Sequence, residues 1–593
     1  MIDIPGAKPL RGLMTTASLD VQPSTTTWTK LADGVEINEE ALTPQAKTLL
    51  TDDVVALLAK AHRRFEHERQ TLLAARRTRQ DAYDDGELPG FLPKEEHPDA
   101  HTDWQVNPLP QDLLQRRVEI TGPVNDPKMV INMLSRTDDG HRADAAMLDF
   151  EDAMKPTWPN VMQGVQNVKE AAEGALSFTK TDADGNAVKE YAIDPDDMPL
   201  LMVRVRGLHL YESNLLVNNI PVSGGLLDLV LTAYHTAQTL IDQGKTPKYY
   251  IPKVEHYEEA RWWNTVLSFI EAELGIDDGT IKTTLLIETL EAAFQMEEIL
   301  YEMRTHAAGL NGGRWDKIFS DIKVLKAHDD RIMADRNSIG MNRSWMSNYV
   351  KQLIRVCHKH GAFGMGGMAP QTPGRTEAMR KQQVEKVVAD KEFEASIGHD
   401  GCWVSHPYFI GPAMKPFNEK LEAKGTTHQL DVIPDLPDQP DLLPKSTSPK
   451  TLDGVRVNVR VAIGYMQGWG NDYGCVAWDN RMEDLATFEI SRAQVWQWLH
   501  HEVTLDDGTD VTPELVTHVF DEEIAVIESE VEDVMEGASD EAIESTKASF
   551  RTARACAEDI FLEDQFRAFL TCASERFGDE AHKEALLRED SCV

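Results

Sequence analysis

The chain has 593 residues, of which 41% are hydrophobic, so it can bury a large core but is too long for one ordinary domain. Its 99 acidic against 60 basic residues give a formal net charge of −39, which disfavours binding to nucleic acid or to an anionic membrane and which we attribute to solubility or to a salty cytoplasm. The six cysteines show no CxxC spacing, the N-terminus has no apolar signal sequence and no apolar run reaches the length of a bilayer, so we expect a cytoplasmic protein with free thiols.

Proline-rich segments divide the chain into parts. Residues 1–36 are rich in threonine, serine and proline and are expected to be mobile. Residues 37–110 contain a long helical pattern followed by a linker, and a second, proline-rich linker occupies 424–450. The segment 451–593 has mostly helical periodicity. The region between the linkers, 111–423, is the predicted catalytic domain.

Eight short apolar or β-prone runs lie in this region, and most are separated by helix-like stretches. Eight such units over roughly 290 residues match the size of a (βα)8 barrel, whose active site forms at the carboxyl ends of its strands. The intervals 152–200 and 207–248 are long, so we expect insertions there, such as TKTDADGNAVKE. The runs are VEITGP (118–123), AAMLDFED (145–152), LLMVRVRG (200–207), KYYIPKVE (248–255), TTLLIET (283–289), AAGLNG (307–312), FGMGGM (363–368) and CWVSHP (402–407).

Charged residues at the ends of two early runs are candidates for the site. Arg204 and Arg206 are two apart in a strand, so both are expected on one face, where each needs an anion. Near a metal, such an arginine would neutralise a developing oxyanion; the alternative is a buried ion pair inside the barrel. In LDFED, Asp149, Glu151 and Asp152 are placed to orient water around a metal, although Asp152 is equally suited to capping the next helix.

The strongest signal is a pair of acids at the ends of two successive runs. Glu288 lies at the end of TTLLIET, and Asp316 closes the block HAAGLNGGRWD about one strand–helix–strand step later. Two carboxylates at neighbouring strand ends can bind one hard cation, and the glycine-rich turn leaves backbone N–H groups for a small anion. Either acid alone more often caps a helix or pairs with a base, but together with this turn they favour a metal site.

These motifs resemble those of the malate synthase family, in its shorter bacterial and plant form. The likeness extends from Ala41 to Phe569, and its most specific block is the signature that ends around Asp316. Thr305 and Lys317 depart from this signature and flank the metal position without supplying a ligand. The other matching segments are RRVEITGPV (116–124), MLDFED (147–152), VRVRGLHL (203–210), TLLIETLEAAFQMEEIL (284–300), GMGGMAP (364–370), GHDGCWVSHP (398–407), MEDLATFEISR (482–492) and VWQWLHH (495–501).

The resemblance implies a (βα)8 TIM barrel with an N-terminal helical clasp and a C-terminal helical plug over the barrel mouth. It implies Glu288 and Asp316 as Mg²⁺ ligands and Arg204 as the group that faces glyoxylate and an enolate oxygen. It implies Asp484 as the catalytic base, although the residues around it mark it only as an acid in the first turn of a helix.

The resemblance also implies substrate contacts. The turn ending at Trp315 and Asp316, which includes Gly313, would bind the glyoxylate carboxylate through backbone N–H groups. Acetyl-CoA would lie along one segment after the first barrel strand, with a lysine near its phosphates, and beside a proline after the last strand. The residues expected at acetyl-CoA are Val124, Lys128, Asn132 and Pro407.

The expected reaction is therefore a Mg²⁺-dependent condensation of glyoxylate with acetyl-CoA, followed by hydrolysis of malyl-CoA to malate and CoA, as in the glyoxylate bypass. One alternative is another Mg²⁺-dependent acyl-CoA lyase or synthase, such as a malyl- or citramalyl-CoA lyase, which the MED block at 482–484 disfavours. A second is an acidic scaffold that retains an inactive barrel, which the presence of all four catalytic and metal residues disfavours. No nucleic-acid or membrane partner is expected, and the oligomeric state is left open between a monomer and a homo-oligomer.

Overall fold

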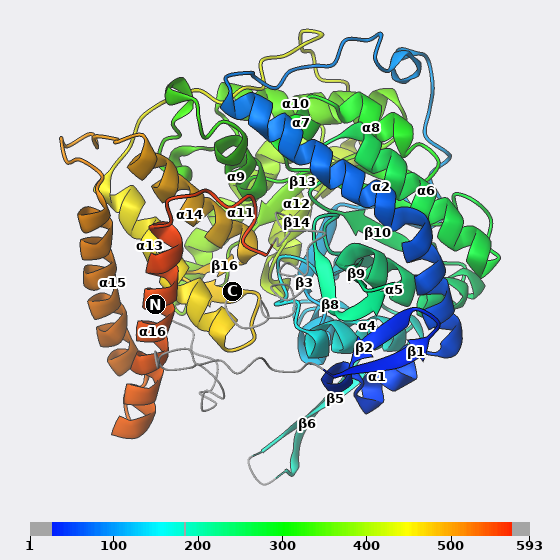
Figure 1. The fold of residues 1–593 in the computed structure, drawn as a ribbon, viewed down its shortest axis with the longest axis horizontal. Coiled ribbons are helices and arrows are strands. Elements are labelled where there is room, and N and C mark those ends of the chain that lie inside the picture. Colours follow the sequence, from blue (N-terminus) through cyan, green and yellow to red (C-terminus); the bar gives the residue numbers. More distant parts are fainter. Residues whose placement is uncertain (1–26, 183–184, 572–593) are drawn as a thin grey trace.

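Eight parallel strands form a closed barrel near the centre of the molecule (Figure 1). The computed structural model describes residues 27–182 and 185–571, so most of the segment expected to be mobile lies outside the described residues. The strands follow one another around the barrel in sequence order, and the last pairs with the first to close it. This arrangement confirms the predicted (βα)8 barrel. The strands are β3 (Val118–Pro123), β4 (Ala145–Asp149), β7 (Leu200–Arg204), β10 (Lys248–Ile251), β11 (Lys282–Ile287), β12 (Ala307–Gly312), β13 (Phe363–Ala369) and β14 (Gly401–Val404).

Helices cover the outside of the barrel, and several begin and end where the sequence supplies capping groups. The hydroxyls of Ser223 and Thr376 accept the first free N–H groups of α5 and α11, and the left-handed glycines Gly275, Gly398 and Gly425 end α6, α11 and α12. The barrel helices are α3 (Pro127–Met133), α4 (Trp158–Ala172), α5 (Gly224–Asp242), α6 (Tyr257–Leu274), α7 (Leu290–Ala293), α8 (Met296–Glu302), α9 (Trp315–Val324), α10 (Ser344–Lys359), α11 (Glu377–Ile397) and α12 (Ile410–Lys424).

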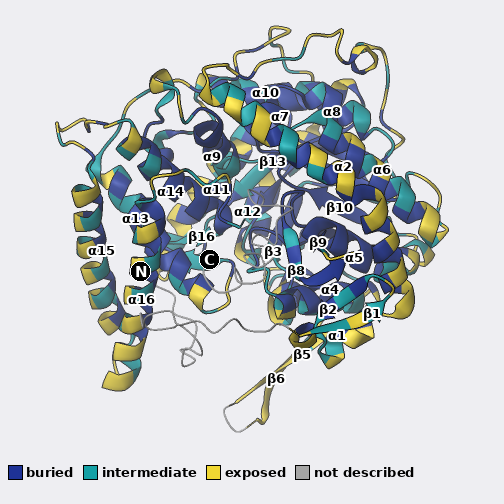
Figure 2. Ribbon diagram, in the orientation of Figure 1, coloured by how far each residue is buried: buried dark blue, intermediate teal, exposed yellow. Residues whose placement is uncertain are grey.

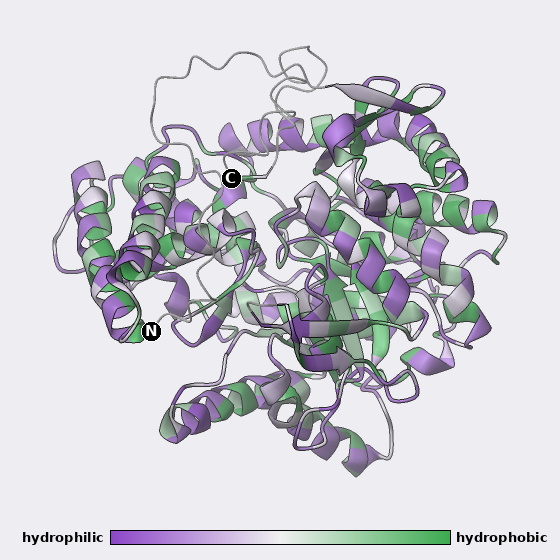
Figure 3. Ribbon diagram, turned by 90° about the horizontal axis from the view of Figure 1, so that it is seen from below, coloured by the Kyte–Doolittle hydropathy of each residue, from purple (hydrophilic) through white to green (hydrophobic). Residues whose placement is uncertain are grey.

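Strand side chains alternate between the barrel interior and the layer beneath the helices. Met147 and Met202 belong to the interior cluster, whereas their neighbours Leu148 and Val203 pack in the outer one. Figure 2 shows the strands as almost entirely buried, and Figure 3 shows them as hydrophobic while the surrounding helices expose polar residues. The barrel is therefore a packed core, and a site can form only at its ends.

Both long intervals carry insertions, as predicted. The first holds the hairpin β5 (Ser177–Thr181) and β6 (Ala187–Ala192), which projects from the body of the molecule (Figure 1). The second holds β8 (Tyr211–Val217) and β9 (Ile220–Ser223), which form an antiparallel sheet with β1 (Trp28–Ala32) and β2 (Val35–Asn38). Part of the segment 1–36, expected to be mobile, thus forms strands, because Val35 and the adjoining Ile37 are buried against the barrel helices.

A long N-terminal helix crosses the outside of the barrel. This helix, α2 (Asp52–Asp84), follows the short α1 (Pro44–Leu49) and packs on α5, α6 and α9. Arg76 is buried in this contact, where its guanidinium donates to both carboxylate oxygens of Glu259 and to the main-chain oxygen of Lys253. The helix therefore fixes the backbone just beyond the carboxyl end of β10.

The C-terminal helices form a separate cluster, which we call the plug (residues 452–561). Its elements are α13 (Leu452–Gly470), β15 (Val476–Trp478), β16 (Arg481–Glu483), α14 (Leu485–His500), α15 (Pro513–Val534) and α16 (Asp540–Phe561). Helical content was expected here, but the short β15–β16 hairpin was not. The plug has its own hydrophobic core, and α14 packs on α9 of the barrel. Within the described residues, no helix combines the length and hydrophobicity needed to span a membrane.

Candidate active site

The carboxyl ends of β4 and β7 are joined by a buried ion pair. Asp149 and Arg204 are register partners at the last positions of these strands. Arg204 Nε donates to Asp149 Oδ1 over 2.7 Å and Nη2 donates to Oδ2 over 2.5 Å, while Nη1 lies 3.3 Å from Glu151 Oε2. The two parallel hydrogen bonds fix the guanidinium plane at the barrel mouth.

Arg206 does not share this site. It lies beyond the end of β7, and its guanidinium binds Asp228 of α5 and Glu212 of β8. The expectation that both arginines face one side fails because the strand ends at Arg204, so the two-residue alternation stops there. The alternative of a buried ion pair describes Arg206, and Arg204 alone faces the cavity.

A lysine that the sequence analysis did not single out lies among the acids. Lys253 follows β10 in a left-handed conformation with φ of 51°, and its main-chain N–H donates to Glu288 Oε1 over 2.9 Å. Its ammonium nitrogen lies 2.7 Å from Glu151 Oε1, 2.7 Å from Asp152 Oδ2 and 3.2 Å from Asp316 Oδ1. Acids that follow three strands, β4, β11 and β12, therefore converge on this one residue.

The LDFED acids make ion pairs with the two cations of the site. Asp149 holds Arg204, and Glu151 and Asp152 hold Lys253. Asp152 does not cap the next helix, because the N-cap residue of α4 is Thr157.

Carboxylates outnumber cations in this cluster, and their pKa values reflect it. Burial raises the pKa of Glu288 to about 8, and the charge of Asp316 adds to the shift. Burial likewise raises the pKa of Asp316, although Lys253 opposes it. Burial alone would raise the pKa of Asp152, but Lys253 and Arg204 outweigh it and lower the value. A further cation beside Glu288 and Asp316 would relieve this excess of negative charge.

The geometry around Glu288 fits a hard divalent cation. Its Oε2 atom is buried and accepts no hydrogen bond. A Cβ atom at Gly313 would lie 3.1 Å from the Glu288 Cβ and 3.3 Å from Oε2, so the glycine keeps this space open. Glu288 and Asp316 supply only oxygen donors, the ligands that Mg²⁺ prefers. The residues present therefore fit such an ion.

The plug contributes Asp484 to the same region. Asp484 is the N-cap residue of α14, and its Oδ1 accepts a hydrogen bond from the Thr487 N–H over 3.4 Å. The following residue, Leu485, connects the plug to the barrel, because its N–H donates to the Asp152 carbonyl over 3.2 Å. Burial, the largest cause, and the charges of Asp152 and Asp316 together raise the pKa of Asp484 to about 8, although Arg204 opposes the shift. Asp484 therefore lies close enough to the barrel acids for their charges to change its pKa.

A cavity of about 210 Å³ connects the groups from barrel and plug. Arg204 and Asp484 both line it, as do the expected acetyl-CoA residues Asn132 and Pro407. Val124 does not line it, because its side chain is buried in the barrel core. The other lining residues are Thr121, Gly122, Pro123, Met129, Met133, Asp149, Ala153, Met368, Ser405, His406, Cys475 and Met482.

Two residues from the plug, Cys475 and Met482, also line the cavity; Met482 was not expected there, whereas Cys475 was expected close to the CoA site. Burial raises the pKa of Cys475 to about 12, so it remains a thiol at neutral pH. Both are carried by the segment around the β15–β16 hairpin, whose position over the barrel no local sequence pattern indicates.

The turn expected to bind glyoxylate begins α9. Trp315 and Asp316 occupy its first two positions, and the first N–H groups of a helix have no partner within it. The N–H of Gly313 instead donates to the hydroxyl of Tyr349 over 3.1 Å, and this hydroxyl also contacts the Ile287 carbonyl. Tyr349, another residue not identified from sequence, thereby fixes the turn to the end of β11.

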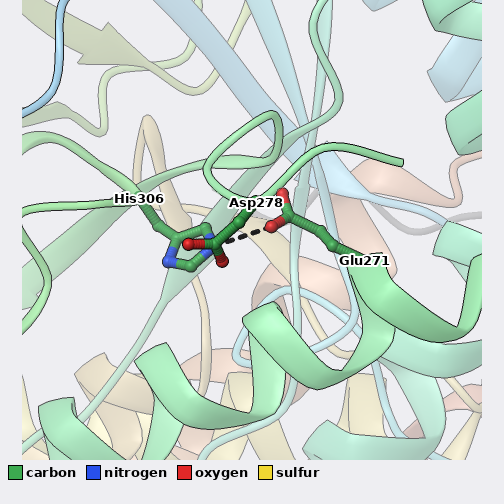
Figure 4. A group of neighbouring side chains, drawn as sticks. All are labelled: Glu271, Asp278 and His306. Carbon is green, nitrogen blue, oxygen red and sulfur yellow. Dashed lines mark hydrogen bonds and ion pairs between the residues drawn. The ribbon is translucent and has the colours of Figure 1, made fainter. Parts of the chain in front are cut away.

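A second group with metal-ligand chemistry lies at the opposite end of the barrel (Figure 4). His306 directly precedes β12; its Nε2 is 3.0 Å from Glu271 Oε2 and 3.8 Å from Asp278 Oδ1. Its Nδ1 contacts Asn264 over 2.7 Å, and Glu271 also accepts the N–H groups of Gly279 and Ile281. These hydrogen bonds satisfy both nitrogens of His306 and the carboxylate of Glu271. The cluster therefore has a structural role, in which it connects the end of α6 to the start of β12.

Family models match three consecutive parts of the chain. A model described as the malate synthase N-terminal domain matches residues 33–97, one described as the malate synthase TIM barrel domain matches 200–439, and one described as the malate synthase C-terminal region matches 449–576. Together they span the clasp helix, most of the barrel and the plug.

Similar proteins from other organisms cover most of the chain. Malate synthase A of Escherichia coli (strain K12) is 42% identical over 490 residues, which are 82% of this chain and 89% of that protein. The malate synthase of Myxococcus xanthus (strain DK1622) is 42% identical over 89% of this chain and 94% of its own length. The glyoxysomal malate synthase of Candida tropicalis is 40% identical over 81% and 86%, respectively.

Proposed function

The chain belongs to the malate synthase family of enzymes, and we propose that it condenses glyoxylate with acetyl-CoA and hydrolyses the product to malate and CoA. One observation carries the proposal: Arg204 of the barrel and Asp484 of the plug line one cavity. The acids Glu288 and Asp316 do not line it but are linked to Arg204 through Glu151 and Lys253. The guanidinium of Arg204, the carboxylate of Asp484 and the two metal-binding carboxylates therefore come from separate elements. Each group has its own surroundings, which set its pKa independently.

Mg²⁺ is the proposed metal, with Glu288 and Asp316 as its ligands. The unpartnered Glu288 Oε2, the open space at Gly313 and the excess of carboxylates support this choice. Bound there, the ion would polarise the glyoxylate carbonyl as a Lewis acid. The N–H groups of Trp315 and Asp316 at the start of α9 are proposed to bind the glyoxylate carboxylate.

Asp484 is the proposed base. The Thr487 N–H engages Oδ1, so Oδ2 is the atom that takes a proton from the acetyl methyl group. The raised pKa makes this carboxylate a stronger base than an exposed aspartate. Asp484 begins α14 of the plug, so the packing of the plug on the barrel places the base in the cavity wall and limits the access of water.

Arg204 is proposed to stabilise the negative charge that develops on the thioester oxygen. Its two hydrogen bonds to Asp149 hold the guanidinium in place before charge appears, so little reorganisation accompanies the reaction. The methyl carbon then attacks the glyoxylate aldehyde carbon, the carbonyl π bond opens, and the aldehyde oxygen takes up one proton, equal in number to the one held by Asp484, to form malyl-CoA. Water adds to the thioester carbonyl, the carbon–sulfur bond breaks, and CoA leaves with a proton on sulfur.

The remaining assignments follow from this scheme. Residues 37–110, 111–423 and 451–593 are proposed to act as clasp, catalytic barrel and plug, joined to the last by the linker 424–450. Acetyl-CoA is proposed to enter past Met129, Asn132 and Pro407, which line the cavity. A cytoplasmic location is proposed because Cys357, Cys402 and Cys475 form no disulfide.

A thiol-release assay tests the function. Purified enzyme is mixed with acetyl-CoA and glyoxylate, with and without Mg²⁺, and free CoA and malate are followed over a range of salt. The proposal is supported if the enzyme releases CoA only when acetyl-CoA, glyoxylate and Mg²⁺ are all present. Accumulation of malyl-CoA without free CoA would favour a lyase, and absence of both products would contradict the proposal.

A further inference from the structure

A second, smaller cavity adjoins the main cavity of about 210 Å³. The residues of the LDFED segment divide between the two: Asp149 lines the main cavity, whereas Glu151 and Asp152 line the smaller one. The consecutive plug residues Asp484 and Leu485 divide in the same way, so the two cavities share a wall. The second cavity has a volume of about 10 Å³, which is enough for one water molecule.

The C-terminal segment 562–571 forms part of the wall of the second cavity. Phe569 lines the cavity and stacks on the ring of His209, with 4.2 Å between the ring centres. The N–H of Leu570 donates to Glu489 of α14 over 2.7 Å, which fixes this segment to the plug. Phe569 and Leu570 are both buried. Barrel, plug and C-terminal segment therefore all contribute to the enclosure of the cavity.

Polar groups in the wall can hold a water molecule. His209 is buried and lines the cavity, and its Nδ1 atom has no hydrogen-bond partner among the described residues. Burial and the charges of Arg76 and Lys253 keep the pKa of His209 well below its usual value, so the ring is neutral and one of its nitrogens is an acceptor. The carboxylates of Glu151 and Asp152 are further acceptors in the same wall. A water molecule needs two to four such partners.

Hydrolysis of malyl-CoA needs water at a moment when the main cavity is occupied. Acetyl-CoA is proposed to bind in the main cavity, so malyl-CoA occupies it after condensation. The second cavity lies near the thioester end, because Glu151 in its wall is 3.3 Å from Arg204, the group proposed at the thioester oxygen. We propose that the second cavity binds one water molecule and supplies it for the hydrolysis of malyl-CoA, with His209 as the residue that positions it.

This inference rests on the proposed function and identifies the source of the water in its last step. The water oxygen bonds to the thioester carbon, and the carbon–sulfur bond breaks with its electron pair on sulfur. One proton of the water ends on the sulfur of CoA. The other is released when the new carboxyl group of malate ionises.

A crystal structure of the wild type tests the binding of water. We expect a water oxygen within about 2.7–3.2 Å of His209 Nδ1. The same water should be absent from His209→Phe, which keeps an aromatic ring beside Phe569 but removes both ring nitrogens. A wild-type cavity without a water at His209 overturns the inference, whether or not the variant folds.

The partition of malyl-CoA tests the supply of water. Malyl-CoA given as the substrate is either hydrolysed to malate and CoA or cleaved back to acetyl-CoA and glyoxylate, and only hydrolysis consumes water. His209→Phe should lower the ratio of hydrolysis to cleavage by about tenfold, the effect of one lost hydrogen bond. His209→Asn, whose side-chain amide can take the place of Nδ1, should recover most of the wild-type ratio.

His62→Phe is the matched control. His62 of α2 is also buried, its Nδ1 also lacks a hydrogen bond within the described part of the chain, and burial lowers its pKa to about 4. Its ratio of hydrolysis to cleavage should equal that of the wild type. Equal ratios in His209→Phe and His62→Phe, or an equal loss of hydrolysis and cleavage in His209→Phe, would overturn the inference and leave the function standing. A wild type that cleaves malyl-CoA without hydrolysing it contradicts the proposed function instead.

Discussion

The main-chain N–H of Lys253 donates a hydrogen bond of 2.9 Å to Oε1 of Glu288. The same residue extends its ammonium group to Asp316, 3.2 Å away, and to two LDFED acids. One residue at the end of β10 therefore contacts both proposed metal ligands. We infer that it aligns these carboxylates and reduces their mutual repulsion.

Replacing Lys253 tests this role. Lys253→Met removes a cation from a buried cluster, which costs about 3–5 kcal/mol when a pair is broken. We expect a lower melting temperature in the presence of a chelator and a larger upward shift on adding Mg²⁺ than in the wild type, because the ion replaces part of the lost charge. Differential scanning fluorimetry measures both values.

The control for this variant lies on the same strand. Lys248 begins β10 and its buried ammonium binds Asp112 over 2.6 Å, at the end of the barrel away from the cavity. Lys248→Met should also lower the melting temperature but should show the wild-type response to Mg²⁺. Equal Mg²⁺ shifts in the two variants would remove Lys253 from the metal site.

Glu288→Gln is expected to raise the Mg²⁺ concentration needed for half-maximal activity by about tenfold or more, since it removes a charged ligand. A Mg²⁺ titration of CoA release measures it. Glu291→Gln is the matched control: Glu291 is buried three residues further on, and burial raises its pKa to about 7, but the charges around it are those of Glu255, Lys323 and Arg79 and not that of Asp316. A Glu288→Gln titration that coincides with the Glu291→Gln curve would count against the ligand assignment.

Asp484→Asn separates the chemical role of this side chain from its structural one. Asparagine is as good an N-cap residue as aspartate, so α14 and the fold should be retained. Turnover is expected to fall by about 10²–10⁴, the usual contribution of a general base. The dissociation constants of glyoxylate and Mg²⁺, measured by calorimetry, should stay within about twofold of the wild-type values. Near-normal turnover in a folded variant would eliminate Asp484 as the base.

The pH profile gives an independent test. Because burial raises the pKa of Asp484 to about 8 and the base must be ionised, activity should be lost as the pH falls below that value. We expect the acid limb of log kcat/KM to have a slope of one and a midpoint far above 3.8, shifted toward 8. A limb with its midpoint near the ordinary aspartate value would show that a different group limits the reaction.

Lys317, one of the departures from the family signature, makes a buried pair with Asp321 one turn further along α9. Burial raises the pKa of Asp321 to about 6, and Lys317 opposes this shift. Lys317→Met should therefore raise the pKa further and destabilise the fold by about 3–5 kcal/mol. The folded wild type holds the Asp321 proton up to a pH of about 6, and the variant holds it to a higher pH. The difference in unfolding free energy between variant and wild type should therefore grow as the pH rises above 6.

Urea unfolding at several pH values measures this effect. Lys317→Met/Asp321→Leu, which removes both charges, should recover most of the stability and lose the pH dependence. If Lys317→Met were as stable at neutral pH as Lys317→Met/Asp321→Leu, the unpaired Asp321 carboxylate would not be the cause of the destabilisation.

The barrel was predictable because each strand is a short apolar run with polar residues at its end, as in TTLLIET, where Glu288 and Thr289 follow β11. Glu288 and Asp316 stood out for the same reason. Lys253 did not, because a lysine after a strand is usually a solvated residue. The placement of Asp484 over the cavity depends on contacts between plug and barrel more than 300 residues apart, such as Leu485 with Asp152, which no local pattern encodes.

The acetyl-CoA contacts were the least predictable part. Val124 follows β3 directly, so a position near the cavity was reasonable, but its side chain points into the core beside α4. The β5–β6 hairpin lies in a turn-rich insertion whose presence was evident from sequence, whereas its packing on α3 was not.

The most direct test of the central claim is the anomalous diffraction of Mn²⁺ in crystals of the enzyme grown with glyoxylate. The account predicts one strong peak bound by both Glu288 and Asp316, at about 2.2 Å from an oxygen of each, on the side that faces Arg204 and Asp484. A peak that contacts neither carboxylate, or one located at Glu271 and His306 instead, would contradict it.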